Sequence, residues 1–144
     1  MSTEEKKALS FLVTRPPNVP NANGVCISLE AMEAAVETLN KRHRVIGEYG
    51  SPSLNAGDLS RFLCVHEDKA ALIASNFRVT DQGIEADIST IGPYGSIAQQ
   101  FIDDGTVAKG SMGFVLRSAV RPDDVKEGVI AKFMPVAVDF VNLK

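Results

Sequence analysis

The stretch GPYGSIAQQFIDDGTVAKGSMGFVLRS, from Gly92 to Ser118, predicts a turn, a short helix and a strand in succession. Its opening Gly-Pro-Tyr-Gly is typical of a turn. Four apolar residues then follow at helical spacing: Ile97, Ala98, Phe101 and Ile102. The next tripeptide, Asp-Asp-Gly, predicts the end of the helix, because Gly105 can take the left-handed backbone conformation. Residues 106–120 carry the β-branched and aromatic side chains that are favoured in strands.

Ser111 lies between two glycines in the tetrapeptide Gly110-Ser111-Met112-Gly113. Glycines allow a backbone to bulge or to approach another group closely, which can expose a small side chain. The serine is therefore a candidate nucleophile. The simpler interpretation is a strand with a bulge and no chemistry, and the tetrapeptide by itself favours it.

Length and composition limit the classes of protein to consider. The chain has 144 residues, of which 44% are hydrophobic and 23% charged, as expected for one globular domain. A net charge of -3 gives no electrostatic support for direct nucleic-acid binding. No apolar run is long enough to cross a membrane, and the N-terminus MSTEEKKALSFLV lacks the apolar core of a secretion signal.

The residues that usually bind metals and cofactors are few. Two histidines and two cysteines, widely spaced, form no metal-ligand pattern, and no phosphate-binding glycine loop is present. We therefore expect no metal and no cofactor. Cys26 and Cys64 are too few for a disulfide framework, which favours a reducing compartment, and we expect both to be small buried residues.

The rest of the chain predicts a second helix and several strands. Ser28 is a predicted helix cap, and an apolar face follows it at helical spacing: Leu29, Met32, Val36 and Leu39. Strands are expected near residues 10–14, 61–65, 70–79, 84–91 and 129–141, and residues 45–52 predict a short strand that runs into a turn. Two helices and six to eight strands indicate an α+β fold with a mostly antiparallel sheet or barrel.

The N-terminal part is expected to lie outside this domain. Residues 15–24 hold three prolines, which remove hydrogen-bond donors and fix the backbone. We therefore predict a flexible or extended N-terminal arm over residues 1–22 and a single domain over residues 23–144.

The order of short motifs is more informative than any one of them. In sequence they are Asn23-Gly24 before a helix, residues 47–52 (GEYGSP) after it, Gln82-Gly83, Pro93-Tyr94-Gly95, residues 109–114 (KGSMGF) and residues 138–141 (VDFV). This succession resembles the prohead (capsid maturation) serine proteases of tailed bacteriophages, whose fold is related to that of the herpesvirus assemblin proteases. The resemblance runs from Asn23 to Val141.

The resemblance implies a catalytic site from which one residue is missing. The family's nucleophile lies on the segment that matches residues 109–114, so Ser111 is the candidate. The segment that matches residues 47–52 usually reads Gly-Glu-x-x-His-Pro in that family, and its histidine is the catalytic base. Here that position is Ser51. A serine hydroxyl cannot replace the base, because it has no group that titrates near neutral pH.

Three other residues are considered as a replacement base. His43 lies in a basic cluster, where positive neighbours disfavour the imidazolium ion that catalysis must form. His66 is followed by two carboxylates, one of which could orient it, although adjacency in sequence does not build a triad. Lys109 would share a face with Ser111 if both lay on a strand. For each of the three, an exposed residue without a catalytic role is the simpler interpretation.

Three functions follow from these observations. The favoured one is a catalytically inactive prohead-protease-like protein that is a structural or decoration component of a phage capsid. The alternatives are an active serine endopeptidase that cleaves scaffold and capsid precursors, and an unrelated α+β binding module. The implied partner is the major capsid protein or the scaffold, with a homo-oligomer also open. The implied location is the virion head, and the host cytoplasm during assembly.

Overall fold

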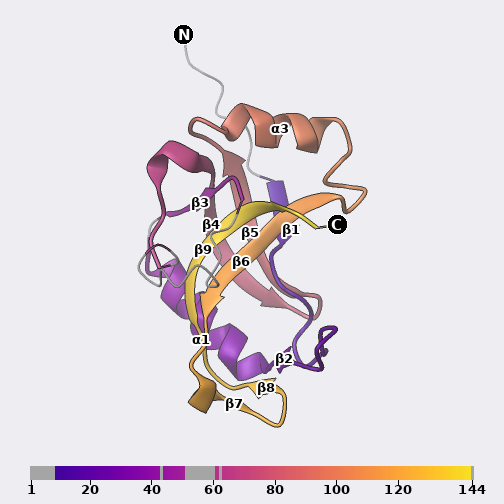
Figure 1. Ribbon diagram of the computed structural model, residues 1–144, viewed down its shortest axis with the longest axis vertical. Helices are drawn as coiled ribbons and strands as arrows, with labels where there is room; N and C mark the ends of the chain where they lie inside the picture. Colours follow the sequence, from indigo (N-terminus) through magenta and orange to yellow (C-terminus); the bar gives the residue numbers. More distant parts are fainter. Residues whose placement is uncertain (1–8, 43, 51–60, 62, 144) are drawn as a thin grey trace.

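The computed structural model describes residues 9–42, 44–50, 61 and 63–143 and shows an α+β fold with mostly antiparallel sheets (Figure 1). The main helices are α1 (Leu29–Asn40) and α3 (Gly95–Asp103), and two 3-10 turns are η2 (Glu67–Lys69) and η3 (Pro122–Asp124). The strands are β1 (Leu9–Leu12), β2 (Cys26–Ile27), β3 (Val45–Glu48), β4 (Ala70–Thr80), β5 (Gly83–Thr90), β6 (Met112–Ala119), β7 (Val125–Lys126), β8 (Val129–Ile130) and β9 (Met134–Asn142). The predicted α+β class is confirmed.

Three sheets make up the fold. The largest has the strand order β1-β5-β4-β3 with antiparallel neighbours. Strands β6 and β9 form an antiparallel two-stranded sheet, the β6–β9 ribbon, which crosses the larger sheet in Figure 1. The smallest sheet has the order β2-β8-β7, and its β2–β8 pair is parallel.

The two larger sheets enclose one core without closing into a barrel in the described part of the chain. On one side, the N–H of Gly50 donates to the C=O of Phe140 at 2.7 Å, and Tyr49 bridges to the same residue. On the other side, the N–H of Leu116 donates to the C=O of Val13 at 3.0 Å. Isolated bonds rather than continuous ladders join the sheets, so the barrel alternative is wrong.

An aromatic cluster fills the space between the two sheets. The ring of Phe114 lies 4.7 Å from that of Phe11 and 5.0 Å from that of Phe140, centroid to centroid. Phe101 of α3 packs on Phe140 at 5.9 Å. These contacts connect β1, β6, β9 and α3, and burial of such rings is a major source of stability.

Helix α1 begins as the sequence predicts. The Ser28 side-chain oxygen accepts a hydrogen bond from the N–H of Ala31 at 3.1 Å, which satisfies one of the free donors of the first turn. Its buried face consists of Ala31, Met32, Ala35 and Leu39. Leu29, predicted on that face, is 41% exposed.

The β4–β5 hairpin also follows the sequence pattern. Ile84, Ala86 and Ile88 are buried on one face of β5, as their alternation predicts. The turn closes by pairing of Thr80 with Gly83.

One predicted strand begins later than expected, and another is absent at its described positions. Strand β6 begins at Met112 rather than at residue 106, because residues 104–110 form turns, in which the N–H of Lys109 donates to Gly105 and that of Ser111 to Thr106. The segment near residues 61–65 has no strand at its described positions, and Cys64 is exposed rather than buried.

The start of the described chain belongs to the main sheet. Strand β1 pairs with β5, and Val13 just beyond it is 2% exposed. The segment predicted as an arm is therefore extended at these residues, but it lies within the folded domain, so the boundary at residue 22 does not separate an arm from the domain.

Strand β3 approaches the backbone of the β6–β9 ribbon closely at Gly47. A Cβ atom there would lie 1.5 Å from the carbonyl oxygen of Val138 and 3.0 Å from Leu72. Glycine is therefore required at this position by contact with the backbone of β9, which cannot move aside without breaking its ladder.

We expect Gly47→Ala to lower the free energy of unfolding by about 3 kcal/mol or more, because the new methyl group overpacks a rigid contact. The matched control is Gly113→Ala, whose Cβ would meet only the end of the Leu143 side chain, which is 51% exposed and can move. Thermal or urea unfolding of both variants measures the difference. Equal losses in the two variants would show that the β3–β9 contact adapts.

Candidate functional site

Ser111 lies at the entry to β6. Its N–H donates to the C=O of Thr106 at 3.2 Å, and its own C=O accepts from the N–H of Leu143 at 2.9 Å. The residue is half-buried. The backbone of the candidate nucleophile is thus fixed between the preceding turn and the end of the chain after β9.

His66 lies on another side of the molecule. It is exposed and directly precedes η2, and its backbone N–H donates to Oε2 of Glu48 at 3.1 Å. Figure 1 shows η2 and the start of β6 on opposite sides of the fold. Within the described residues, no hydrogen bond connects His66 with Ser111. The structure does not bring these two predicted site residues together.

The other candidate residues are placed only in part. Ser51 and His43 lie outside the described residues. Arg42 donates to the carbonyls of Pro135 and Val136 at the start of β9, whereas Ser111 contacts Leu143 beyond the end of that strand. Lys109 is exposed and lies in a turn rather than on a strand, so the expected shared strand face does not exist.

The structure instead brings together four charged residues that the sequence analysis did not group. Glu48 of β3, Arg117 of β6 and Asp139 of β9 are each at most 4% exposed, and Arg61 joins them from the segment before η2. We call these four residues the ion cluster. Two carboxylates and two guanidinium groups give it no net charge.

Bidentate hydrogen bonding organises the ion cluster. Arg117 donates through Nε and Nη2 to the two carboxylate oxygens of Asp139, both at 2.7 Å. Its Nη2 also donates to Oε2 of Glu48 at 3.1 Å. Arg61 donates to both oxygens of Glu48, at 2.5 and 2.9 Å. Such paired, charge-assisted bonds are the strong class of hydrogen bond in proteins.

The register of the β6–β9 ribbon explains why these side chains meet. Asp139 pairs with Val115, so Asp139 and Arg117 are diagonal neighbours on one face of the ribbon. The opposite face carries Phe114 and Phe140 and packs in the core. On this same face of the ribbon, Val115 is 40% exposed whereas Asp139 is 1% exposed. The polar face is therefore covered at the ion cluster and open to solvent beside it.

Glu48 remains ionised throughout the neutral range. Burial by itself would raise the pKa of this carboxyl group, but hydrogen bonds from Arg61, from the N–H of His66 and from Arg117 lower it to about 2. Burial by itself would lower the pKa of the Arg117 guanidinium. Hydrogen bonds and charge attraction to Asp139 and Glu48 more than offset this effect and raise that pKa above its ordinary value. A carboxylate with so low a pKa cannot accept a proton near pH 7, so the ion cluster is not built for general base catalysis.

A sequence signal for the ion cluster did exist. Arg117 interrupts the apolar run FVLRS, and Asp139 interrupts VDFV. Charged residues inside buried strands are rare unless they are paired. Glu48 lies three residues before the position that matches the family's histidine, but nothing in the sequence indicated that it pairs with residues about 70 and 90 positions away.

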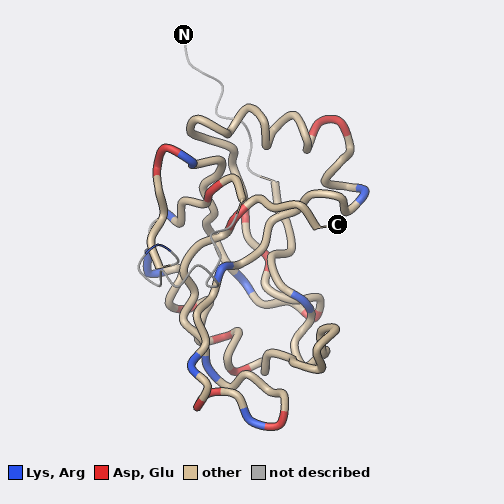
Figure 2. Tube along the Cα trace, viewed as in Figure 1, with Lys and Arg blue, Asp and Glu red and all other residues tan. Residues whose placement is uncertain are grey.

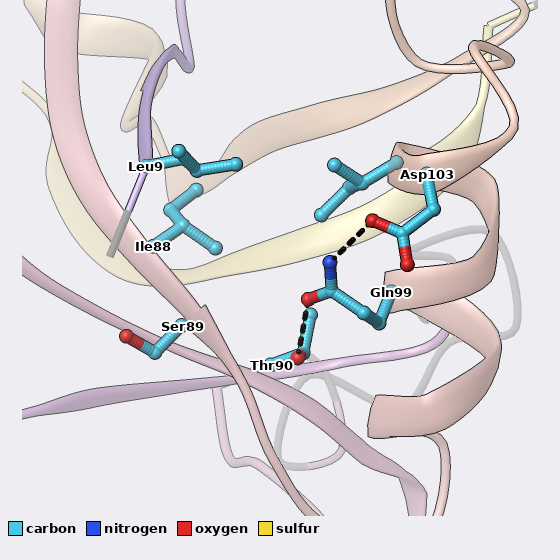
Figure 3. A pocket seen from close by; sticks show the side chains of 7 residues that line it. Leu9, Ile88, Ser89, Thr90, Gln99 and Asp103 are labelled. Atoms are coloured by element: carbon cyan, nitrogen blue, oxygen red, sulfur yellow. Dashed lines mark hydrogen bonds between the residues drawn. The ribbon is translucent and has the colours of Figure 1, made fainter. Parts of the chain in front are cut away.

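A separate cavity of about 310 Å³ lies between α3 and the edge of the main sheet (Figure 3). Gln99 spans its wall, accepting from the Thr90 hydroxyl at 2.9 Å and donating to Asp103 at 2.8 Å. The other lining residues are Leu9, Ile88, Ser89 and Ile102. The described candidates Ser111, His66 and Lys109 do not line this cavity.

Comparison with known proteins gives no match to a family model, to a curated protein or to a solved structure. Among the described residues, no three His, Cys, Asp or Glu side chains are grouped as metal ligands. The described helices include none with the length and apolar character needed to span a membrane.

We expect Arg117→Met to lower the free energy of unfolding by about 3–5 kcal/mol, because it leaves the buried Asp139 carboxylate without its cation. The control is Arg78→Met, which removes an arginine that also binds two carboxylates, Glu85 and Asp87, but with a side chain 35% exposed. Exposed ion pairs contribute up to about 1 kcal/mol. Urea unfolding at pH 7 compares the two variants, and similar costs would contradict a stabilising role for the ion cluster.

We expect stability to fall as the pH is lowered from about 5 to about 2. Because the pKa of Glu48 is about 2 in the folded protein and near 4.5 when unfolded, the unfolded chain binds more protons in this range. The contribution is complete above pH 5 and amounts to about 3 kcal/mol. Urea unfolding across this range should give a flatter profile for Glu48→Gln than for the wild type, and an unchanged profile would refute the assignment.

Proposed function

We propose that this chain is a catalytically inactive prohead-protease-like protein that forms a structural or decoration component of a phage capsid. The observation that carries the proposal is the separation of Ser111 from the imidazole of His66, in a chain with Ser51 where the resembling family has its catalytic histidine. The nucleophile position is kept, and the described histidine is not within reach of it.

Serine proteolysis needs a base close to the nucleophile. A serine hydroxyl becomes an effective nucleophile only when a group within hydrogen-bond distance takes its proton. His66 faces solvent elsewhere, and Glu48 is held as a fully ionised partner of two arginines. Loss of the base typically lowers the rate of a serine protease by several orders of magnitude. A protein that must process many neighbours in a closed shell would not tolerate this loss.

A role in assembly fits the surface and the interior. Acidic and basic positions are interspersed along the chain in Figure 2, and the net charge is -3. In the described part of the chain, every buried side-chain polar atom has a hydrogen-bond partner. The proline-rich segment at residues 15–20 turns at Pro17 and Asn18, and its exposed residues 18–20 offer a surface for contact with a neighbouring subunit. The partner in this proposal is the major capsid protein or the scaffold, and the location is the virion head.

An active serine endopeptidase is the second candidate, and one observation favours it. Ser111 is half-buried beside Gly110, which has a positive φ of 80°, so the hydroxyl sits at a turn beside the surface. This candidate requires a base from outside the described residues.

Co-expression with the cognate capsid and scaffold proteins tests the two candidates. We expect both precursors to stay uncut, and Ser111→Ala to behave as the wild type. Ser118→Ala, which changes a half-buried serine of β6, is the matched control. Cleavage that is lost in Ser111→Ala and kept in Ser118→Ala would establish the protease and exclude the inactive protein.

Quantitative mass spectrometry of purified particles tests the structural role separately. A structural or decoration component should be present in a fixed ratio to the major capsid protein. Absence from mature particles would contradict that role, whatever the outcome of the cleavage experiment.

A further inference from the structure

A groove lies beside β6, where the segment that follows β1 runs toward β2 (Figure 1). We call it the edge groove. It has a volume of about 260 Å³, and all its lining residues belong to the described part of the chain. From β6 and its C-terminal end, the lining residues are Val115, Leu116, Ser118 and Val120, and most of the others lie within residues 13–27. Val115 and Leu116 point to opposite faces of the strand, so the groove follows the edge of β6 rather than one of its faces.

The backbone groups of β6 alternate between β9 and the groove. On the β9 side, the C=O of Ser111 accepts from the N–H of Leu143. On the other side, the N–H of Leu116 donates to the C=O of Val13, in the segment after β1. Successive residues of a strand direct their backbone groups to opposite sides, so Ser118 directs its N–H and C=O to the same side as Leu116, away from β9.

Ser118 therefore has an open pair of backbone groups. Its partner in the register is Pro135, which has no N–H to donate, and the C=O of Pro135 accepts from Arg42 instead. On the groove side, no backbone hydrogen bond from the described residues reaches Ser118. An N–H and a C=O left free on a strand edge are the groups with which an added strand pairs.

The edge groove itself suits apolar side chains. Its lining includes the buried Val13 and Met32, and it also includes the exposed Val19 and Val120. Sites for drug-sized ligands have volumes of about 300–1,000 Å³. The smaller edge groove therefore has room for one or two side chains of a segment that pairs with Ser118.

Arg15 is the one charged residue in the lining of this groove. It is exposed, and none of the ion pairs between described residues includes it. A carboxylate on the occupant would thus meet a positive charge that has no acidic partner within the described fold. Complementary charge of this kind favours one class of partner over others.

We propose that the edge groove binds an extended peptide segment of a partner protein, with apolar side chains and a carboxylate beside them. One residue of the segment exchanges two backbone hydrogen bonds with Ser118 and so extends β6 by a short added strand. Apolar side chains of the segment lie in the groove, and its carboxylate pairs with Arg15. The inference does not depend on the capsid role, because it concerns the chemistry of the segment and not its source.

Protection of Cys26 from alkylation tests the site in the full-length wild-type protein. Cys26 lines the edge groove, whereas the exposed Cys64 does not and is the internal control. The probe is the peptide acetyl-Asp-Val-Leu-Val-Asp-amide, with an aspartate at each end to meet Arg15 in either strand direction. At a probe concentration about ten times its Kd, we expect iodoacetamide to modify Cys26 about tenfold more slowly. Mass spectrometry of digested protein should show an unchanged rate at Cys64.

Two substitutions separate backbone pairing from charge pairing. Ser118→Pro removes the N–H and should raise the Kd of the probe about tenfold, whereas the matched control Ser118→Ala keeps the N–H and should leave the Kd unchanged. Arg15→Gln should raise the Kd about fivefold, but not for a probe that ends in asparagine instead of aspartate. Far-ultraviolet circular dichroism establishes that each variant is folded. If Ser118→Pro does not fold, a probe N-methylated at its three central residues removes the same bonds and should bind as weakly.

Three results would overturn the proposal. The first is a Cys26 rate that the probe does not change. The second is equal protection by the N-methylated probe, which would make the groove a site for apolar groups without strand pairing. The third is a wild-type dimer in size-exclusion chromatography that Ser118→Pro converts to a monomer, because the occupant would then be a second copy of this chain.

Discussion

The pairing of one buried carboxylate with two arginines connects the separate parts of this fold. Glu48 ends β3, Arg117 and Asp139 come from the two strands of the ribbon, and Arg61 comes from the segment before η2. Each of these charges would be costly to bury alone, so the group is stable only when all its members are in place. That requirement fixes the position of β3 against β9 and ties Arg61 to the end of β3. The ion cluster thus acts together with the isolated backbone bonds that join the two larger sheets.

Close packing reinforces the same junction. The backbone of β9 approaches Gly47 so closely that no side chain fits there. On the core side of the ribbon, the rings of Phe11, Phe114 and Phe140 link the far edge of the main sheet to the same strands. The ribbon is therefore held by apolar contacts on one face and by charge pairing on the other. This division explains how a strand pair can carry an arginine and an aspartate inside the protein without an unpaired charge.

Whether Ser111 can act as a nucleophile depends on the distance and protonation state of a base, not on the presence of a serine alone. A serine in a suitable turn is present, but the described histidine is placed by its backbone bond to Glu48 on another side of the fold. Glu48 itself is committed to the ion cluster, with a pKa of about 2. These features support an inactive relative of the prohead proteases as the proposal most consistent with the chemistry, with the capsid as the proposed setting.

The sequence by itself determined the local elements: the cap at Ser28, the hairpin closed at Gly83, the alternation along β5 and the helix that ends before Gly105. These depend on neighbours a few residues apart, whose periodicity and turn chemistry can be read directly. The sequence did not determine the late start of β6, the inclusion of β1 in the main sheet or the ion cluster. Each of these depends on contacts between residues far apart in the chain, as between Glu48 and Arg117, and those pairings exist only once the strands are placed. Charged residues in an apolar strand indicate that partners are needed, but only the tertiary structure decides which partners they find.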